Sequence, residues 1–102
     1  MVEKKIVVIA DPYTAALYRL LGVTVYEAAT SGEARRALAD AIEREDTGIV
    51  FIAAEYYTVL EEDISAARRK RKDIIISTLP TIRERGKPMD VQKELLKALG
   101  MG

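Results

Sequence analysis

The sequence contains no cysteine and no histidine. Their absence excludes disulfide bonds, cysteine nucleophiles, histidine bases and the commonest zinc ligands. Neither a G-x-G-x-x-G motif nor a G-x-x-x-x-G-K-S/T motif occurs, which excludes the usual glycine-rich phosphate loops. No apolar run approaches the roughly 20 residues that a membrane-spanning helix needs. We therefore expect no catalytic residues, no cofactor, no metal ion and no direct membrane insertion.

An excess of charge of one sign is also lacking, because 16 basic residues face 16 acidic ones in 102 residues. The balance gives no overall attraction to nucleic acid or to an anionic membrane surface. Asparagine is absent and Gln92 is the single glutamine, which favours a thermophilic source. Residues 1–5 lead directly into an apolar strand pattern rather than a signal peptide, so we expect a cytosolic protein.

Apolar runs are what the chain has in abundance. Two of them are unbroken, at 6–10 and 49–54, and a third segment, 74–79, begins with three isoleucines and is interpreted as a third central-type strand. A continuous run of this length is typical of a strand that is buried on both faces of a parallel sheet. Residues 23–26 alternate apolar and polar side chains instead, which predicts a shorter, more exposed edge strand.

Helical patterns separate these strands. Thr30 and Glu33 have the spacing of a capping box at the start of the clearest amphipathic helix. Either Asp11 or Thr14 could cap the first helix, and Gly22 is suited to end it in the left-handed conformation. The predicted helical segments are 13–21, 30–45, a short turn at 55–60, 62–71 and a C-terminal helix at 91–99.

The alternation of strands and helices predicts an α/β fold. Right-handed crossovers give a small four-stranded parallel sheet of order 2-1-3-4 with helices on both faces, a Rossmann-like or flavodoxin-like arrangement. A length of 102 residues fits a single domain, 1–102. Within it we expect a loop at 81–90 and a C-terminal helix at 91–99, both able to remain mobile.

Ligands of such sheets bind at the carboxyl ends of the strands, which here carry Asp11, Glu55 and Thr78. The carboxylate of Asp11 and the missing N–H of Pro12 disfavour phosphate, and we interpret Asp11 as a turn former and helix cap. Receiver domains place a phospho-accepting aspartate after the third strand, where this chain has Ala53 and Ala54. The alternative function is therefore a free-standing, receiver-like protein-binding or regulatory module that lacks a phosphoacceptor.

One basic cluster, Arg68–Lys72, could contact nucleic acid or lipid headgroups. The interpretation as a solvated helix end is favoured, because acidic residues begin that helix and basic ones end it, as the helix dipole prefers. The five tyrosines do not interleave with the cluster, and we interpret them as core edges or protein-contact residues.

Several stretches in order along the chain resemble the F subunits of the archaeal A-type ATP synthases and V-type ATPases. The similar stretches are Ile9–Asp11 at the end of the first strand, Thr14–Val23, the turn Asp46–Val50, Leu79–Thr81 and Lys97–Gly100. Within Thr14–Val23, matching positions are Tyr18, Arg19, Leu20, Gly22 and Val23.

The resemblance implies a non-catalytic central-stalk subunit of the rotor. Such subunits bind the coiled-coil D subunit inside the ring of A and B subunits, and torque passes through the stalk while protons or sodium ions cross the membrane sector. It also implies a cytoplasmic protein that is peripheral to the cell membrane through the complex, with no nucleic-acid partner.

Four residues are the expected partner contacts. We expect Leu17, Leu20 and Leu21 to pack against the sheet, which would turn Tyr18 and Arg19 towards the rim. Tyrosine and arginine are the residue types that most often anchor interfaces. The C-terminal helix supplies the other two expected contacts, Leu96 and Met101.

Overall fold

The structure of the protein is a computed structural model that describes residues 3–79. The elements are β1 (Lys5–Ala10), α1 (Pro12–Arg19), β2 (Thr24–Glu27), α2 (Ser31–Glu43), β3 (Thr47–Ala53), α3 (Ala54–Val59), α4 (Glu61–Lys70) and β4 (Ile75–Leu79). The predicted loop at 81–90 and C-terminal helix at 91–99 lie outside the described residues.

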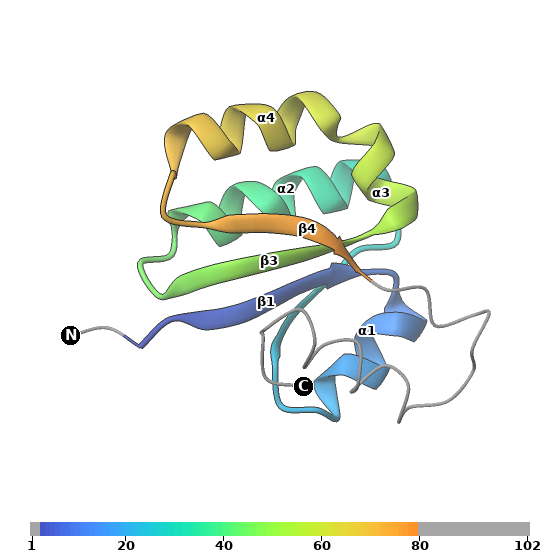
Figure 1. Ribbon diagram of the computed structural model, residues 1–102. Coiled ribbons are helices and arrows are strands. Elements are labelled where there is room, and N and C mark those ends of the chain that lie inside the picture. Colours follow the sequence, from blue (N-terminus) through green and yellow to red (C-terminus); the bar gives the residue numbers. More distant parts are fainter. Residues whose placement is uncertain (1–2, 80–102) are drawn as a thin grey trace.

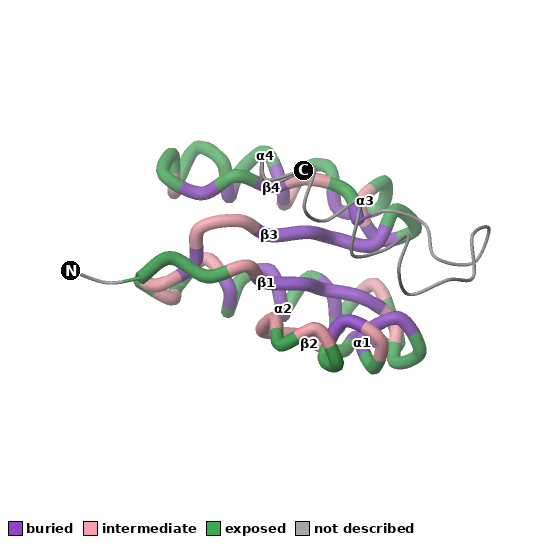
Figure 2. The backbone as a smooth tube through the Cα atoms, turned by 60° about the horizontal axis from the view of Figure 1, so that its bottom comes forward, coloured by how far each residue is buried: buried purple, intermediate pink, exposed green. Residues whose placement is uncertain are grey.

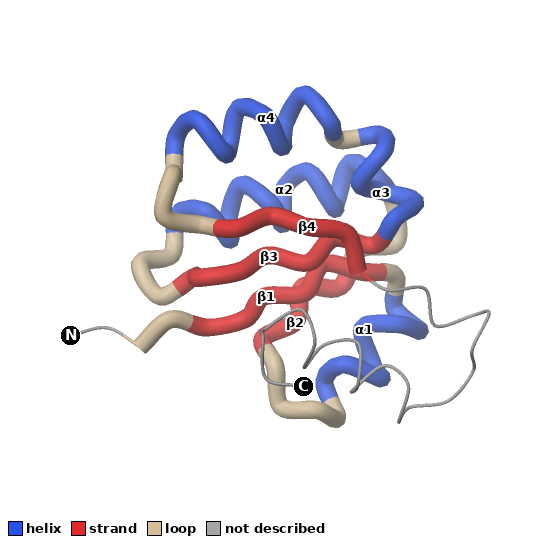
Figure 3. Tube along the Cα trace, viewed as in Figure 1, coloured by secondary structure: helices blue, strands red, loops and turns tan. Residues whose placement is uncertain are grey.

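The four strands form one parallel sheet of order β2-β1-β3-β4, which confirms the predicted topology. Helix α1 covers one face, and α2, α3 and α4 cover the other (Figures 1 and 3). The order reverses between β1 and β3, since β2 is added on one side of β1 and β3 on the other. The carboxyl ends of β1 and β3 are therefore the place where this fold would hold a ligand.

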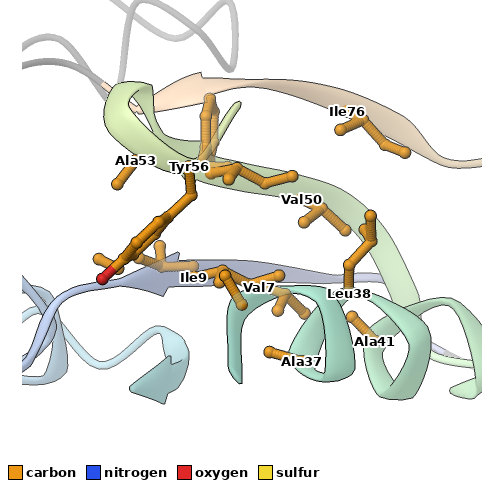
Figure 4. Close-up of a cluster of buried hydrophobic side chains, with 14 of the residues drawn as sticks. Val7, Ile9, Ala37, Leu38, Ala41, Val50, Ala53, Tyr56 and Ile76 are labelled. Carbon is orange, nitrogen blue, oxygen red and sulfur yellow. The ribbon is translucent and has the colours of Figure 1, made fainter. Parts of the chain in front are cut away.

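Strands β1 and β3 form the centre of the sheet, and both are buried along most of their length (Figure 2). Val7, Ile9 and Val50 contribute to the core beneath α2 together with Leu38 (Figure 4). The unbroken apolar runs of β1 and β3 are thus explained by helices on both faces of the sheet. Strand β4, which the sequence suggested as a central-type strand, instead lies at an edge and has Ile75 and Thr78 exposed. Strand β2 is an edge strand of intermediate burial, as its alternating pattern predicts.

Helix α1 is rotated relative to the prediction. Its buried residues are Thr14, Ala15 and Tyr18, whereas Ala16 and Leu20 are exposed. The expectation that Leu20 packs on the sheet and that Tyr18 turns outward is therefore wrong. The two stripes are adjacent on the helix, and the one-residue turn at Asp11 decides between them because it sets the angle at which the chain leaves β1.

Helix α2 begins as its sequence predicts. The backbone N–H of Glu33 donates to Thr30 Oγ1 at 3.1 Å, and Glu33 Oε1 accepts from the N–H of Ala29 at 3.0 Å. The last turn of α2 has no basic residue of its own. Arg71, beyond α4, instead donates from its guanidinium to the carbonyls of Ile42 and Arg44. This contact places a positive charge at the negative end of the α2 dipole.

A buried hydroxyl joins the start of β3 to the end of α2. Thr47 is inaccessible to solvent, and its Oγ1 donates to the carbonyl of Ala41 at 2.8 Å. That carbonyl also accepts from the N–H of Arg44 at 3.3 Å, so it keeps one partner when the hydroxyl is removed.

We predict that Thr47→Val lowers the free energy of unfolding by about 1 kcal/mol, the net value of one hydrogen bond, because valine has nearly the same shape. The matched control is Thr58→Val, since the exposed Thr58 hydroxyl lies 3.4 Å from the Ala54 carbonyl. The control should change the stability by no more than about 0.5 kcal/mol. Urea denaturation measures both, and equal losses would contradict the assignment.

Two arginine–aspartate pairs lie near the amino ends of β3 and β4 and make the folding stability depend on pH. Arg44 lowers the pKa of the Asp46 carboxyl, and Arg71 lowers the pKa of the Asp73 carboxyl. The corresponding N···O distances are 3.0 and 2.9 Å. Because both folded pKa values lie below the ordinary 3.8, these pairs stabilise the protein above that pH.

We predict that stability is lost as the pH falls below the ordinary carboxyl pKa and towards the folded values. The double variant Asp46→Asn with Asp73→Asn should be less stable than wild type at neutral pH and should lose less stability on acidification. Denaturation midpoints measured across this pH range test the prediction, and parallel curves for the two proteins would refute it.

Candidate functional site

The carboxyl ends of the strands do not gather the predicted polar residues into one site. Asp11 caps α1, where its Oδ2 accepts from the N–H of Thr14 at 3.1 Å. Glu55 is exposed in the first turn of α3, and Thr78 is exposed on β4. Among residues 3–79, no group of three or more acidic side chains could hold a metal ion.

Tyr56 fills the position between β1 and β3 where the strand order reverses. It belongs to α3, which begins directly after β3, and its side chain is 8% exposed. Its hydroxyl donates to the carbonyl of Ala28 at 2.8 Å, and the N–H of Ala28 donates to the carbonyl of Ala10 at 2.8 Å. The ring therefore reaches from the end of β3 across the end of β1 to the residue after β2 (Figure 4).

Three carboxylates lie near the Tyr56 hydroxyl at this edge. Burial raises the pKa of the Tyr56 hydroxyl, and the nearby carboxylates of Glu55, Asp11 and Glu33 raise it further. Negative charges at this edge disfavour phosphate groups. Sequence reasoning placed Tyr56 at a core edge or a protein contact and missed its position across the sheet.

The position of a receiver's acceptor aspartate is taken by small apolar side chains. Ala53 ends β3 and is 8% exposed, and Ala54 begins α3. Neither alanine can accept a phosphoryl group. The alternative function therefore stays a receiver-like module that lacks a phosphoacceptor.

The basic cluster at the end of α4 is divided among three neighbours. Arg68 donates to the Tyr57 hydroxyl and the Ile76 carbonyl, Lys70 forms an ion pair with Glu43, and Arg71 pairs with Asp73. These contacts tie α4 to α3, α2 and the start of β4. The cluster is an exposed helix end, as predicted, and three of its side chains also connect α4 to its neighbours.

The outward face of α1 carries an apolar stripe in place of a chemical site. Tyr13 is 67% exposed and Leu20 is 83% exposed, with the exposed Ala16 between them. Their spacing of i, i+3 and i+7 places the three on one side of the helix. Arg19 is also exposed, as predicted, and its guanidinium lies 3.9 Å from the carboxylate of Glu27. The other two predicted contacts, Leu96 and Met101, lie outside the described residues.

The described residues define a doubly wound α/β domain with a buried tyrosine at the carboxyl ends of β1 and β3 and with two exposed large apolar side chains on one face of α1. Within residues 3–79, no helix is long and apolar enough to cross a membrane.

The chain belongs to the family described as ATP synthase (F/14-kDa) subunit, whose sequence profile matches residues 6–96. It is similar to the F subunit of the A-type ATP synthase of Archaeoglobus fulgidus, with 27% identity over 99 residues that cover 96% of this chain and 95% of the relative. The crystal structure of the V-type ATP synthase F subunit of the same organism shares the fold. Its TM-score is 0.56 at 24% identity, and the match covers 72% of this chain and 96% of that one. The family resemblance read from the sequence is thereby confirmed.

We predict that Tyr56→Ala lowers the free energy of unfolding by about 3–5 kcal/mol, because it leaves a cavity where a large aromatic ring was buried. Tyr56→Phe keeps the ring and loses one hydrogen bond, at a cost of about 1 kcal/mol. Tyr13→Ala removes an exposed ring and serves as the control, with an expected change within about 0.5 kcal/mol. Similar losses for Tyr56→Ala and Tyr13→Ala in urea denaturation would contradict the buried position.

The raised pKa of Tyr56 gives a second, independent prediction. The folded state holds the hydroxyl proton more tightly than the unfolded state, whose tyrosine pKa is 10.0. Wild type should therefore lose stability as the pH rises above the unfolded value and towards the folded one. Tyr56→Phe has no such proton, so its loss of stability over the same range should be smaller. Denaturation midpoints on both sides of this pH measure the difference, and equal slopes would refute it.

Proposed function

We propose that this protein is a non-catalytic central-stalk subunit of an A/V-type rotary ATP synthase or ATPase. The observation that carries the proposal is the similarity to the F subunit of an A-type ATP synthase over 96% of the chain. In this role the protein binds the coiled-coil D subunit inside the ring of A and B subunits. It supports ATP synthesis or hydrolysis coupled to proton or sodium transport, without taking part in the chemistry.

Two features of the carboxyl edge support a non-catalytic role. The position at which doubly wound sheets hold nucleotides is filled by the Tyr56 ring. The field around that ring comes from three carboxylates, which disfavour a polyphosphate. The same role implies a cytoplasmic location, peripheral to the membrane through the complex.

The outward face of α1 supports binding to a coiled coil. Tyr13, Ala16 and Leu20 have the a/d spacing with which one helix packs its side chains between those of another. The small side chain of Ala16 lets a partner helix approach closely between two larger side chains. Arg19 lies at the flank of this stripe, where a charged residue sets the orientation of a partner.

We predict that Leu20→Asp weakens binding to the purified D subunit by about tenfold or more, since a charge placed in an apolar contact costs at least about 1.4 kcal/mol. Val59→Asp is the matched control, because Val59 is 57% exposed on α3, away from the stripe. Arg19→Glu and a truncation after Asp90, which removes Leu96 and Met101, should each weaken binding as well. Isothermal titration calorimetry measures the affinities, and circular dichroism checks folding.

The possible outcomes distinguish an error in the proposed function from an error in the proposed α1 interface. If wild type binds the D subunit and all the α1 variants bind equally well, the interface lies elsewhere, and the edge strand around Val25 and Tyr26 is the next surface to test. If wild type itself does not bind the D subunit, the proposed function is wrong.

A further inference from the structure

Within residues 3–79, strand β4 forms one edge of the sheet. Its single neighbour in the sheet is β3, so the backbone groups on its other side have no strand partner among the described residues. The strand reads Ile-Ile-Ser-Thr-Leu, without a charged residue or a proline, and Ile75 is 62% exposed. An uncharged, β-branched edge of this kind is a template for pairing with a strand of another molecule.

Arg68 reaches this strand from the neighbouring helix α4. Its Nη2 donates to the carbonyl of Ile76 at 2.9 Å and to the hydroxyl of Tyr57, on α3, also at 2.9 Å. This hydrogen bond holds a charged guanidinium against the backbone of the edge strand. A charge held against an edge strand disfavours the addition of a further strand.

The choice of partners sets Arg68 apart from the other cations of its cluster. Lys70 pairs with Glu43 and Arg71 with Asp73, whereas the partners of Arg68 within residues 3–79 are a hydroxyl and a backbone carbonyl. The opposite edge differs as well, because β2 has its own charged residue, Glu27. Strand β4 has none, and the charged group in contact with its backbone is Arg68 of α4.

We propose that Arg68, held in place by Tyr57, prevents β4 of one copy from pairing with β4 of a second copy. The pairing it prevents is an antiparallel β4–β4 contact across a two-fold axis, which would join two four-stranded sheets into one continuous sheet. The inference concerns the isolated protein and does not depend on the proposed rotary role.

The test compares Arg68→Ala with Arg69→Ala in the full 102-residue chain. Arg69 is the exposed neighbour on α4, so the control removes the same charge without touching β4. Light scattering coupled to size exclusion should give the monomer mass for wild type and for Arg69→Ala at all concentrations. Arg68→Ala should shift towards twice that mass as concentration rises, and Tyr57→Phe should show a smaller shift in the same direction.

Hydrogen exchange locates the contact. In Arg68→Ala, backbone amides of residues 75–79 should gain protection as the concentration rises, while circular dichroism stays that of the folded protein. The proposal is overturned if folded Arg68→Ala remains a monomer, if Arg69→Ala associates equally, or if a dimer forms without protection in β4. If Arg68→Ala misfolds, the Tyr57→Phe variant provides the test. In that case, a Tyr57→Phe variant that stays monomeric at all concentrations overturns the proposal.

Discussion

The buried ring of Tyr56, oriented by the hydrogen bond from its hydroxyl to the Ala28 carbonyl, is the contact that determines what the carboxyl edge of the sheet can bind. The hydrogen bond holds the aromatic ring across the ends of β1 and β3, between the segments that follow β2 and β3. Doubly wound sheets bind their ligands at this point, because the loops diverge there and leave a crevice. Once a side chain of the protein fills the crevice, what the fold can offer a partner is its outer surface.

That outer surface is unevenly divided. Two ion pairs, Arg35–Asp63 and Lys70–Glu43, join α2 to α4 on one face of the sheet. The apolar exposure is concentrated at a few side chains, of which Tyr13 and Leu20 share one face of α1. A helix that presents an apolar stripe is suited to a helical partner, and the membership in the ATP synthase F family is consistent with such a role.

The sheet could be predicted from the sequence because its signals are local. An unbroken apolar run such as β1 is typical of a strand buried on both faces of a parallel sheet. Thr30 and Glu33, three residues apart, form the capping-box hydrogen bonds by themselves. The rotation of α1 could not be predicted, since two adjacent stripes both have helical spacing and the turn at Asp11 selects between them. The role of Tyr56 was missed for a related reason. The direction of the Tyr56 side chain depends on α3 beginning directly after β3, without a loop. No short sequence motif predicts this junction.

Because the Tyr56 ring is buried at the carboxyl ends of β1 and β3, we expect no phosphate ligand to bind there. The most direct test is a titration of the isotopically labelled full chain with magnesium and ATP, ADP or acetyl phosphate, followed by two-dimensional NMR of the backbone amides. The account predicts that the amides of Asp11, Ala28, Glu55 and Tyr56 do not shift in a saturable way. Saturable, stoichiometric shifts at these residues would contradict it.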